Sequence, residues 1–153
     1  MIVKDLAVLD VKSCSPETDL ATAARIMWDC DCGAVPVVSD DRKVLGMVTD
    51  RDICIAAATR AARPSDIRVA DVMSRDVAAC RMDDDVRVAL KTMKAQRLRR
   101  LPVLDAGDRL AGILSMNDLA LHAECRPKAA VSGEVFLDTL RTICAHTRVP
   151  QTV

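Results

Sequence analysis

Apolar residues first recur at helical spacing in this chain and then give way to two short apolar runs. One face of the first predicted helix carries Leu20, Ala23, Ala24 and Met27. Intervals of three and four residues place side chains on one side of a helix, and Thr18 or Asp19 is suited to cap its start. The runs at 34–38 and 44–48 are separated by a polar turn and predict two strands. A second helix is expected from Thr49 onward.

The same pattern returns 66 residues later without a gap. The second predicted helix face carries Val86, Ala89, Leu90 and Met93. Strands are predicted at 101–104 and 110–114, and a helix should follow from Ser115. The segment GMVTDRDI at 46–53 corresponds to GILSMNDL at 112–119. A gapless internal repeat indicates one supersecondary unit that is used twice.

Each copy also has a short predicted strand before its first helix, near residues 11–14 and 77–80. The order is β-α-β-β-α, twice, which predicts an α+β fold with repeats at 3–68 and 69–126. A unit of this size buries too little surface to be stable alone. The two copies should therefore share a core and pack with pseudo-two-fold symmetry around a cleft.

The remaining residues, 127–153, form a C-terminal tail outside the repeats. Apolar residues recur in it at helical spacing: Val135, Phe136, Leu140 and Ile143. The tail is therefore predicted to be helical. An apolar helix outside the repeats has to cover something, either its own pair of repeats or a second copy of the chain.

Composition narrows the classes of function. The net charge is zero, so no overall field attracts nucleic acid or an anionic membrane. Trp28 and Phe136 are the only aromatic residues, too few for the stacking platforms of single-strand binding. The longest apolar run is too short to cross a bilayer, and the start of the chain lacks a signal-peptide pattern. We expect a cytoplasmic protein without a nucleic-acid or membrane partner.

The chain has seven cysteines, which in a reducing compartment pack as small apolar groups. Cys30 and Cys32 are the only close pair, and a structural zinc site would need two further ligands. The residues that would have to supply them are Cys54, Cys125, Cys144, His122 and His146. Their spacing follows no metal motif, so no metal site is predicted. No catalytic constellation emerges either.

The repeat resembles a known family. The β-α-β-β-α order, the apolar strand with an early proline at Pro36 and Pro102, and the Gly-apolar-apolar-[Ser/Thr]-x-x-Asp segment in two copies are similar to cystathionine-β-synthase-type (CBS) domain pairs. The resemblance covers residues 3–126. It implies a sensor without catalytic activity that binds an adenosine-containing ligand between the repeats. AMP, ADP and ATP are the commonest ligands of the family, and NAD is a further candidate.

Two interpretations fit the paired motifs Thr49-x-x-Asp52 and Ser115-x-x-Asp118. A hydroxyl followed three residues later by a carboxylate is a capping box in all but the length of the acid. A carboxylate that faces a cleft can also accept hydrogen bonds from both hydroxyls of a ribose. The resemblance favours ribose binding by these four residues, with capping and binding able to hold together.

The copies differ in charge. Arg99 and Arg100 lead into the second proline strand, whereas Gly33 and Ala34 lead into the first. Guanidinium groups bind phosphate in a bidentate manner, although a run of charges is more often a solvated surface. The resemblance implies that phosphate contacts come from the copy opposite the ribose. Arg99 and Arg100 would then serve the nucleotide on Asp52, and Arg51 the one on Asp118. Asn117 is the counterpart of Arg51 and completes the phosphate candidates.

Adenine needs an apolar slot, and with no aromatic residue in either motif its walls must be aliphatic. The candidates for one slot are Cys14, Val35, Pro36 and Ile53, and those for the other are Cys80, Leu101, Pro102 and Leu119. Gly46 and Gly112 lie within strands, where we expect close packing rather than ligand contact.

Together these features predict a regulatory module that binds an adenine nucleotide, has no catalytic cofactor and signals to a separate, unidentified protein. A homodimer is expected, since paired CBS units commonly associate. Two alternatives stay open: a ligand-free structural or interaction dimer, and a redox- or metal-responsive protein that uses its cysteines.

Overall fold

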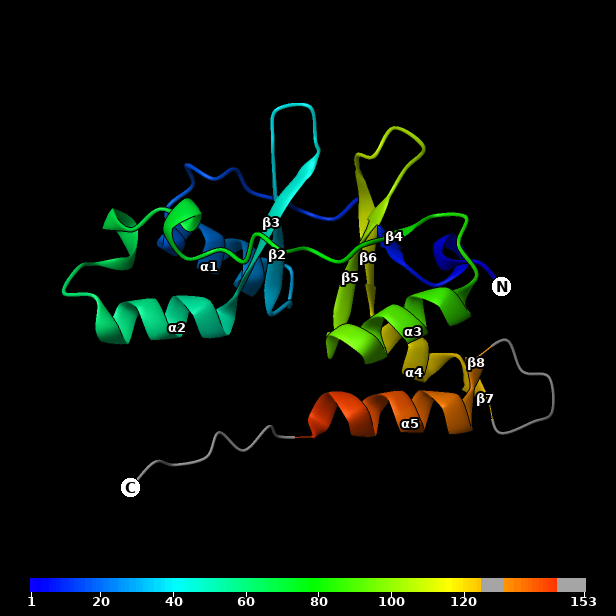
Figure 1. The fold of residues 1–153 in the computed structure, drawn as a ribbon. Coiled ribbons are helices and arrows are strands. Elements are labelled where there is room, and N and C mark those ends of the chain that lie inside the picture. The colour runs from blue at the N-terminus through cyan, green and yellow to red at the C-terminus, as the bar shows by residue number, and fades with distance from the viewer. Residues whose placement is uncertain (125–130, 146–153) are drawn as a thin grey trace, which may run out of the picture.

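The structure is a computed structural model of the chain that describes residues 1–124 and 131–145. Two lobes lie side by side, each with a β-hairpin flanked by helices (Figure 1). Cys125, His146 and the rest of 125–130 and 146–153 lie outside the described residues. None of the described helices has the length and apolarity needed to cross a membrane.

The first lobe follows the predicted order closely. Its elements are α1 (Leu20–Asp29), β2 (Ala34–Val38), β3 (Val44–Thr49) and α2 (Asp50–Thr59). Asp19 caps α1, because its Oδ1 accepts a hydrogen bond from the backbone N–H of Thr22 at 2.9 Å. Leu20, Ala23 and Met27 are buried, as the helical spacing predicts. Two short 3₁₀-helices, η2 (Pro64–Asp66) and η3 (Val69–Asp71), follow α2.

The second lobe has the same order. Its elements are β4 (Cys80–Arg81), α3 (Val86–Gln96), β5 (Arg100–Leu104), β6 (Leu110–Ser115) and α4 (Met116–Leu121). The two hairpins are equivalent, because Ala34 lies opposite Thr49 in β2–β3 and Arg100 lies opposite Ser115 in β5–β6. Each motif hydroxyl therefore stands beside the entry into its own repeat's proline strand.

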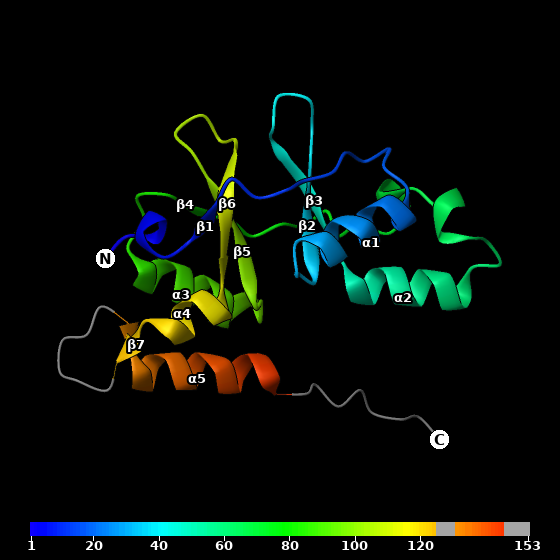
Figure 2. The same cartoon turned by 180° about the vertical axis from the view of Figure 1, so that it is seen from behind.

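The first segment of each repeat crosses to the other lobe. The 3₁₀-helix η1 (Val3–Asp5) and β1 (Val8–Leu9) lie on the second lobe, where Val8 pairs with Ile113 (Figure 2). The equivalent bridge joins Ser74 to Met47 in the first lobe. The predicted strands near 11–14 and 77–80 are shorter than expected. Cys14 forms one isolated bridge, and β4 begins only at Cys80.

This exchange explains the two strand glycines. A Cβ added to Gly112 would lie 2.5 Å from the carbonyl oxygen of Val8, and one added to Gly46 would lie 2.7 Å from that of Ser74. No side chain fits at either crossing point. The expected close packing is confirmed at both positions.

The prediction of one shared core is wrong. Buried apolar residues form two clusters, one in each lobe. Val3 and Leu6 from the start of the chain complete the second cluster, and Ile67, Val69 and Met73 complete the first. The crossing segments thus supply the surface that each small unit lacks. The hairpin tips also meet, at a bridge between Lys43 and Arg109.

The described part of the tail contains the predicted helix, which packs on its own second lobe. The helix α5 (Gly133–Cys144) lies against α3 and α4, and Phe136, Leu140 and Ile143 contact the second core. Lys94 on α3 forms an ion pair with Asp138 on α5. A short parallel pair of β7 (Ala123–Glu124) and β8 (Val131–Ser132), which the sequence did not predict, precedes the helix.

Candidate functional site

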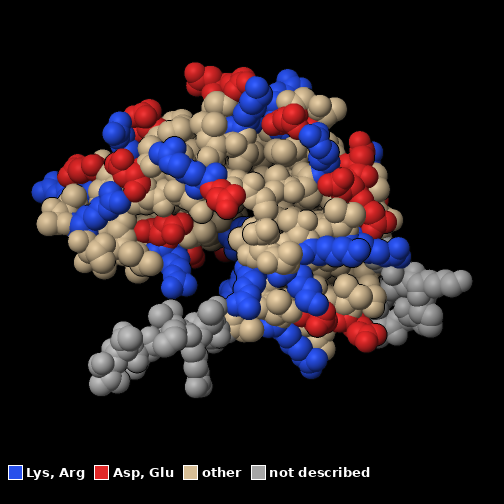
Figure 3. Space-filling view, viewed as in Figure 1, with Lys and Arg blue, Asp and Glu red and all other residues tan. Residues whose placement is uncertain are grey.

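Two clefts between the lobes are related by the same 66-residue offset as the repeats. The first, called here the Asp52 cleft, has a volume of about 540 Å³. The second, the Asp118 cleft, has a volume of about 480 Å³. The Asp52 cleft is the hollow between the two halves of the surface in Figure 3, with Lys and Arg side chains beside it.

Each cleft combines the motif of one repeat with the strand entry of the other. Thr49, Arg51 and Asp52 line the Asp52 cleft together with Arg99 and Arg100. Ser115, Asn117 and Asp118 line the Asp118 cleft together with Cys32, Gly33 and Ala34. The fold therefore brings all four predicted ribose residues into clefts.

Both motifs form full capping boxes. The backbone N–H and the hydroxyl of Thr49 donate to Oδ2 of Asp52 at 2.9 and 2.7 Å, and the N–H of Asp52 donates to Oγ1 of Thr49 at 3.2 Å. In the second motif the backbone N–H and the hydroxyl of Ser115 donate to Oδ2 of Asp118 at 2.7 and 2.6 Å, and the N–H of Asp118 donates to Oγ of Ser115 at 3.3 Å. Among the described residues, no group donates to Oδ1 of either carboxylate. Each aspartate is held in place by one oxygen and keeps an acceptor on the other.

Four arginines line the Asp52 cleft, and one of them, Arg100, also lines the Asp118 cleft. Arg51, Arg99 and Arg100 all line the Asp52 cleft, and so does Arg97. Arg51 was expected to serve the Asp118 cleft, but it lines the Asp52 cleft, because it stands on the first turn of α2 directly before Asp52. Asn117 lines the Asp118 cleft for the same reason.

The apolar walls differ from those predicted. Cys14, Val35, Cys80, Leu101 and Leu119 are buried in the two cores. Pro36 is buried and lines neither cleft. Only Pro102 lines one of the clefts, the Asp52 cleft. Side chains alternate between the two faces of a strand, so the residues beside the motif point into the lobes.

The observed walls come from other segments. Met47, Val77, Ala78 and Ile143 line the Asp52 cleft, and Val8, Val11 and Ile113 line the Asp118 cleft. The residues around 8–11 and 74–78 could have been found from the repeat, because they precede the first strand of each copy at the same offset. Ile143 has no counterpart in the repeat, and no sequence signal indicates it.

Comparison with known proteins gives the family. The CBS domain model matches residues 3–58 and 69–124, ranges that hold both capping boxes and both strand entries. This chain belongs to the CBS domain family. Its two CBS domains form a tandem pair.

Relatives of the CBS pair include short proteins and parts of enzymes. YlbB of Bacillus subtilis is 32% identical over 128 residues, which cover 83% of this chain and 85% of YlbB. The inosine-5'-monophosphate dehydrogenase of Methanocaldococcus jannaschii is 29% identical over 165 residues, which cover 93% of this chain but only 32% of the enzyme. The chain thus spans about a third of that enzyme.

Solved structures share the fold. Hypoxic Response Protein I, with two coordinated zinc ions, has a TM-score of 0.73 at 27% identity, covering 81% of this chain and all of that one. CBSX2 in complex with AMP has a TM-score of 0.65 at 22% identity, covering 78% of this chain and 93% of that one. At 22% identity the likeness to CBSX2 concerns the fold.

The cysteines of the CBS pair fall into two classes. Cys14 and Cys80 are buried, and burial raises the pKa of Cys14 to about 11 and that of Cys80 to about 12. Cys30, Cys32, Cys54 and Cys144 are exposed. Within residues 1–124 and 131–145, no three His, Cys, Asp or Glu side chains are grouped so that they could hold a metal ion.

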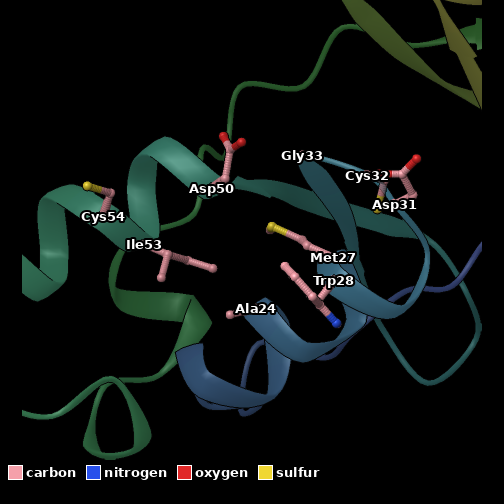
Figure 4. Close-up of a pocket in the computed structure, with 9 residues that line it drawn as sticks. All are labelled: Ala24, Met27, Trp28, Asp31, Cys32, Gly33, Asp50, Ile53 and Cys54. Carbon is pink, nitrogen blue, oxygen red and sulfur yellow. The ribbon is translucent and has the colours of Figure 1, made fainter.

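A third cavity lies on the outer side of the first lobe. Met27 and Ile53 reach towards one another between α1 and α2, with Trp28 beside them (Figure 4). Ile53, a predicted adenine contact, therefore lies in this outer groove instead of a cleft. Trp28 is 84% exposed. The equivalent face of the second lobe, between α3 and α4, is covered by α5.

Proposed function

We propose that this CBS pair is a sensor without catalytic activity that binds an adenine nucleotide in the Asp52 cleft. One observation carries the proposal: the carboxylate of Asp52 shares a cleft with the strand-entry arginines of the other repeat, Arg99 and Arg100. A hydrogen-bond acceptor for ribose hydroxyls and hydrogen-bond donors for phosphate thus come from different repeats and line the same cleft.

The capping box supports the ribose contact. Because Oδ2 of Asp52 accepts two hydrogen bonds from Thr49, the carboxylate is fixed before a ligand arrives. Its Oδ1 can then accept hydrogen bonds from ribose hydroxyls without the loss of side-chain freedom that binding otherwise requires. In the Asp118 cleft, Ser115 fixes the carboxylate of Asp118 in the same way and leaves the same acceptor for ribose hydroxyls.

The positive charge supports phosphate binding. Within the described parts of the chain, the guanidinium groups of Arg51, Arg99 and Arg100 make no hydrogen bond or ion pair. Charge-assisted hydrogen bonds from Arg to phosphate are among the strong polar interactions. The first turn of α2 at the same cleft adds a positive dipole end. AMP, ADP and ATP are therefore the ligands that we favour, with NAD as a further candidate.

The base would lie against aliphatic side chains. Met47, Val77, Ala78 and Pro102 give the Asp52 cleft an apolar wall. Adenine buries a flat apolar face there, although no aromatic side chain stacks on it.

The tail gives the sensor an output. Ile143 of α5 lines the Asp52 cleft although α5 lies outside the matched CBS domains. A ligand in the cleft would contact α5 and shift its position through differential affinity for the two arrangements. We propose that this change is read by a separate effector protein. The exposed free thiols fit a reducing compartment, which we propose is the cytoplasm.

We also propose a homodimer through the outer groove between α1 and α2. In the second lobe the equivalent helix pair is covered by an amphipathic helix, α5. In the first lobe no described segment covers this face, which carries the exposed Trp28. The same face of a second copy would cover it, with Trp28 of each copy in the groove of the other.

Thermal unfolding with AMP, ADP, ATP and NAD in turn tests the nucleotide proposal. A ligand at 100 times its dissociation constant adds about 2.7 kcal/mol to stability, so at least one of them should raise the midpoint clearly. If none of them does, the proposal fails and a ligand-free interaction dimer accounts better for the fold. A rise with zinc alone would instead favour a metal-responsive protein.

A further inference from the structure

One cation is common to both clefts. Arg100 lines the Asp52 cleft and also the Asp118 cleft. Its counterpart in the first repeat is Ala34, which has no charge to offer. The pseudo-two-fold arrangement of the fold therefore contains a single guanidinium where symmetry would provide two.

The surroundings of Arg100 leave its guanidinium available to either side. The side chain is half-buried, and it makes no hydrogen bond or ion pair with any group in residues 1–124 and 131–145. Its Nη1 lies 3.7 Å from the point where a Cβ on Gly33 would stand. Gly33 itself lines both clefts. A Cβ at position 33 would also lie 2.9 Å from Oδ2 of Asp50, so the absence of a side chain there leaves room for the Asp50 carboxylate and the Arg100 guanidinium at the boundary between the clefts.

We propose that Arg100 is a phosphate ligand shared by the two clefts, so that phosphate-bearing ligands bind to them with negative coupling. This inference rests on the proposed binding of nucleotides and concerns how the two sites influence one another. A guanidinium that is bidentate to a phosphate in one cleft has its donors committed there. A phosphate that binds in the other cleft then receives no hydrogen bond from Arg100.

The order of filling follows from the other charges. Without Arg100, the Asp52 cleft still offers Arg51 and Arg99, beside the carboxylates of Asp50 and Asp76. The Asp118 cleft then keeps Lys12, beside the carboxylates of Asp10 and Asp31. The Asp52 cleft should therefore bind its ligand first, and the phosphate of that ligand should bind the guanidinium of Arg100. Adenosine has no phosphate, so its binding to the two clefts should be independent.

A thermodynamic cycle measures the coupling. Asp52→Ala leaves only the Asp118 cleft with its ribose acceptor, and Asp118→Ala leaves only the Asp52 cleft. Calorimetric titration with ATP gives one dissociation constant for each variant and two for the unchanged protein. For independent clefts, the product of the two constants of the unchanged protein equals the product of the single-cleft constants.

With ATP, we expect the product of the two dissociation constants of the unchanged protein to exceed the product of the single-cleft constants by about tenfold, since one charge-assisted hydrogen bond to a phosphate is of this order. With adenosine, the two products should be equal. Arg100→Ala, introduced into all three proteins, should make the products equal with ATP as well. Arg99→Ala is the matched control. It lines only the Asp52 cleft, so it should weaken that site and leave the coupling in place.

The outcomes are distinct. Equal products with ATP in the unchanged protein would overturn the coupling while leaving nucleotide binding intact. Failure of Asp52→Ala to bind ATP at all would also overturn it, because no second phosphate site would exist. A single ATP bound to the unchanged protein, with binding retained in Asp52→Ala, would support strong coupling. Absence of ATP binding in every protein would refute the proposed nucleotide function itself and the coupling with it.

Discussion

At the residue scale, the two strand glycines show how the crossing segments constrain the sequence. Gly112 leaves room for the carbonyl of Val8, which would lie 2.5 Å from an added Cβ. Gly112→Ala should lower the free energy of unfolding by about 1–3 kcal/mol, because the backbone of β1 has to move. Denaturant unfolding measures the change. Gly107→Ala is the control and should stay within about 0.5 kcal/mol, since its nearest neighbours are flexible side chains.

The thiols make a second prediction at this scale. The raised pKa values of Cys14 and Cys80 keep both thiols protonated in the folded chain well above pH 9.0, their ordinary pKa. Unfolded thiols ionise near that ordinary value, so the stability that comes from burying them is complete below pH 9.0. It is lost progressively as the pH rises towards 11.

Alkylation mapped by mass spectrometry checks this distinction. At pH 8, Cys30, Cys32, Cys54 and Cys144 should react quickly, and Cys14 and Cys80 should react only as fast as the protein opens. Fast labelling of Cys80 under native conditions would contradict the burial described here. The free energy of unfolding should also fall from pH 9 upward, and it should fall less steeply in Cys80→Ala.

Polar and charged residues of the clefts were easier to find from the sequence than the apolar residues that line them. Asp52 and Asp118 stand at a fixed place in a repeated motif, and Arg99 and Arg100 differ visibly from Gly33 and Ala34. Most of the predicted adenine contacts do not line a cleft, because an apolar residue next to a motif looks the same in the sequence whether its side chain faces a core or a cleft. Leu101 and Pro102 are adjacent in β5, yet only Pro102 reaches the Asp52 cleft.

At the element scale, helical periods predicted α1 and α3, and apolar runs on either side of a polar turn predicted both hairpins. The helices α2 and α4 were expected from the hydroxyl residues at their starts, Thr49 and Ser115. The crossing of β1 could not be predicted. A strand of two residues has no period, and its partner lies on the other repeat. For the same reason the parallel pair β7–β8 left no sequence signal.

The tail helix offers a prediction for this scale. Leu140 contacts the second core, whereas Leu137 on the same helix is 43% exposed. Leu140→Ala should lower the free energy of unfolding by about 2 kcal/mol through the loss of packing, and Leu137→Ala by less than about 0.5 kcal/mol. Equal effects of the two changes, measured by denaturant unfolding, would contradict the packing of α5 on the second lobe.

At the scale of the whole molecule, symmetry of the backbone coexists with asymmetry in charge and covering. The repeats give two equivalent clefts, but Arg51, Arg97 and Arg99 line only the Asp52 cleft. The helix pair of the second lobe is covered by α5, whereas nothing in residues 1–124 and 131–145 covers that of the first lobe. Two clefts with equivalent backbones can therefore differ in the ligands that they favour, since the differences lie in a few side chains and one added helix.

The outer groove of the first lobe leads to a prediction about assembly. Trp28→Glu should convert the proposed dimer to a monomer in sedimentation velocity, because a charge in the α1–α2 groove of each copy is costly to bury. Leu121→Glu is the matched control, since Leu121 is equally exposed at 84% but lies at the end of α4. A dimer that survives Trp28→Glu and dissociates in Leu121→Glu would place the interface on the second lobe instead.

The central claim is that Asp52 holds a nucleotide as well as capping α2, and calorimetric titration of ATP tests it most directly. Asp19 provides the control, because its carboxylate also stabilises the start of a helix but lines neither cleft. Asp19 is the N-cap of α1, whereas Asp52 is the N3 residue of the capping box of α2. Asp52→Ala and Asp19→Ala should lose similar stability, about 0.5–2 kcal/mol each. The account predicts that Asp52→Ala weakens the tighter ATP site by at least about tenfold and that Asp19→Ala leaves it unchanged. Equal affinity in the two variants would contradict it.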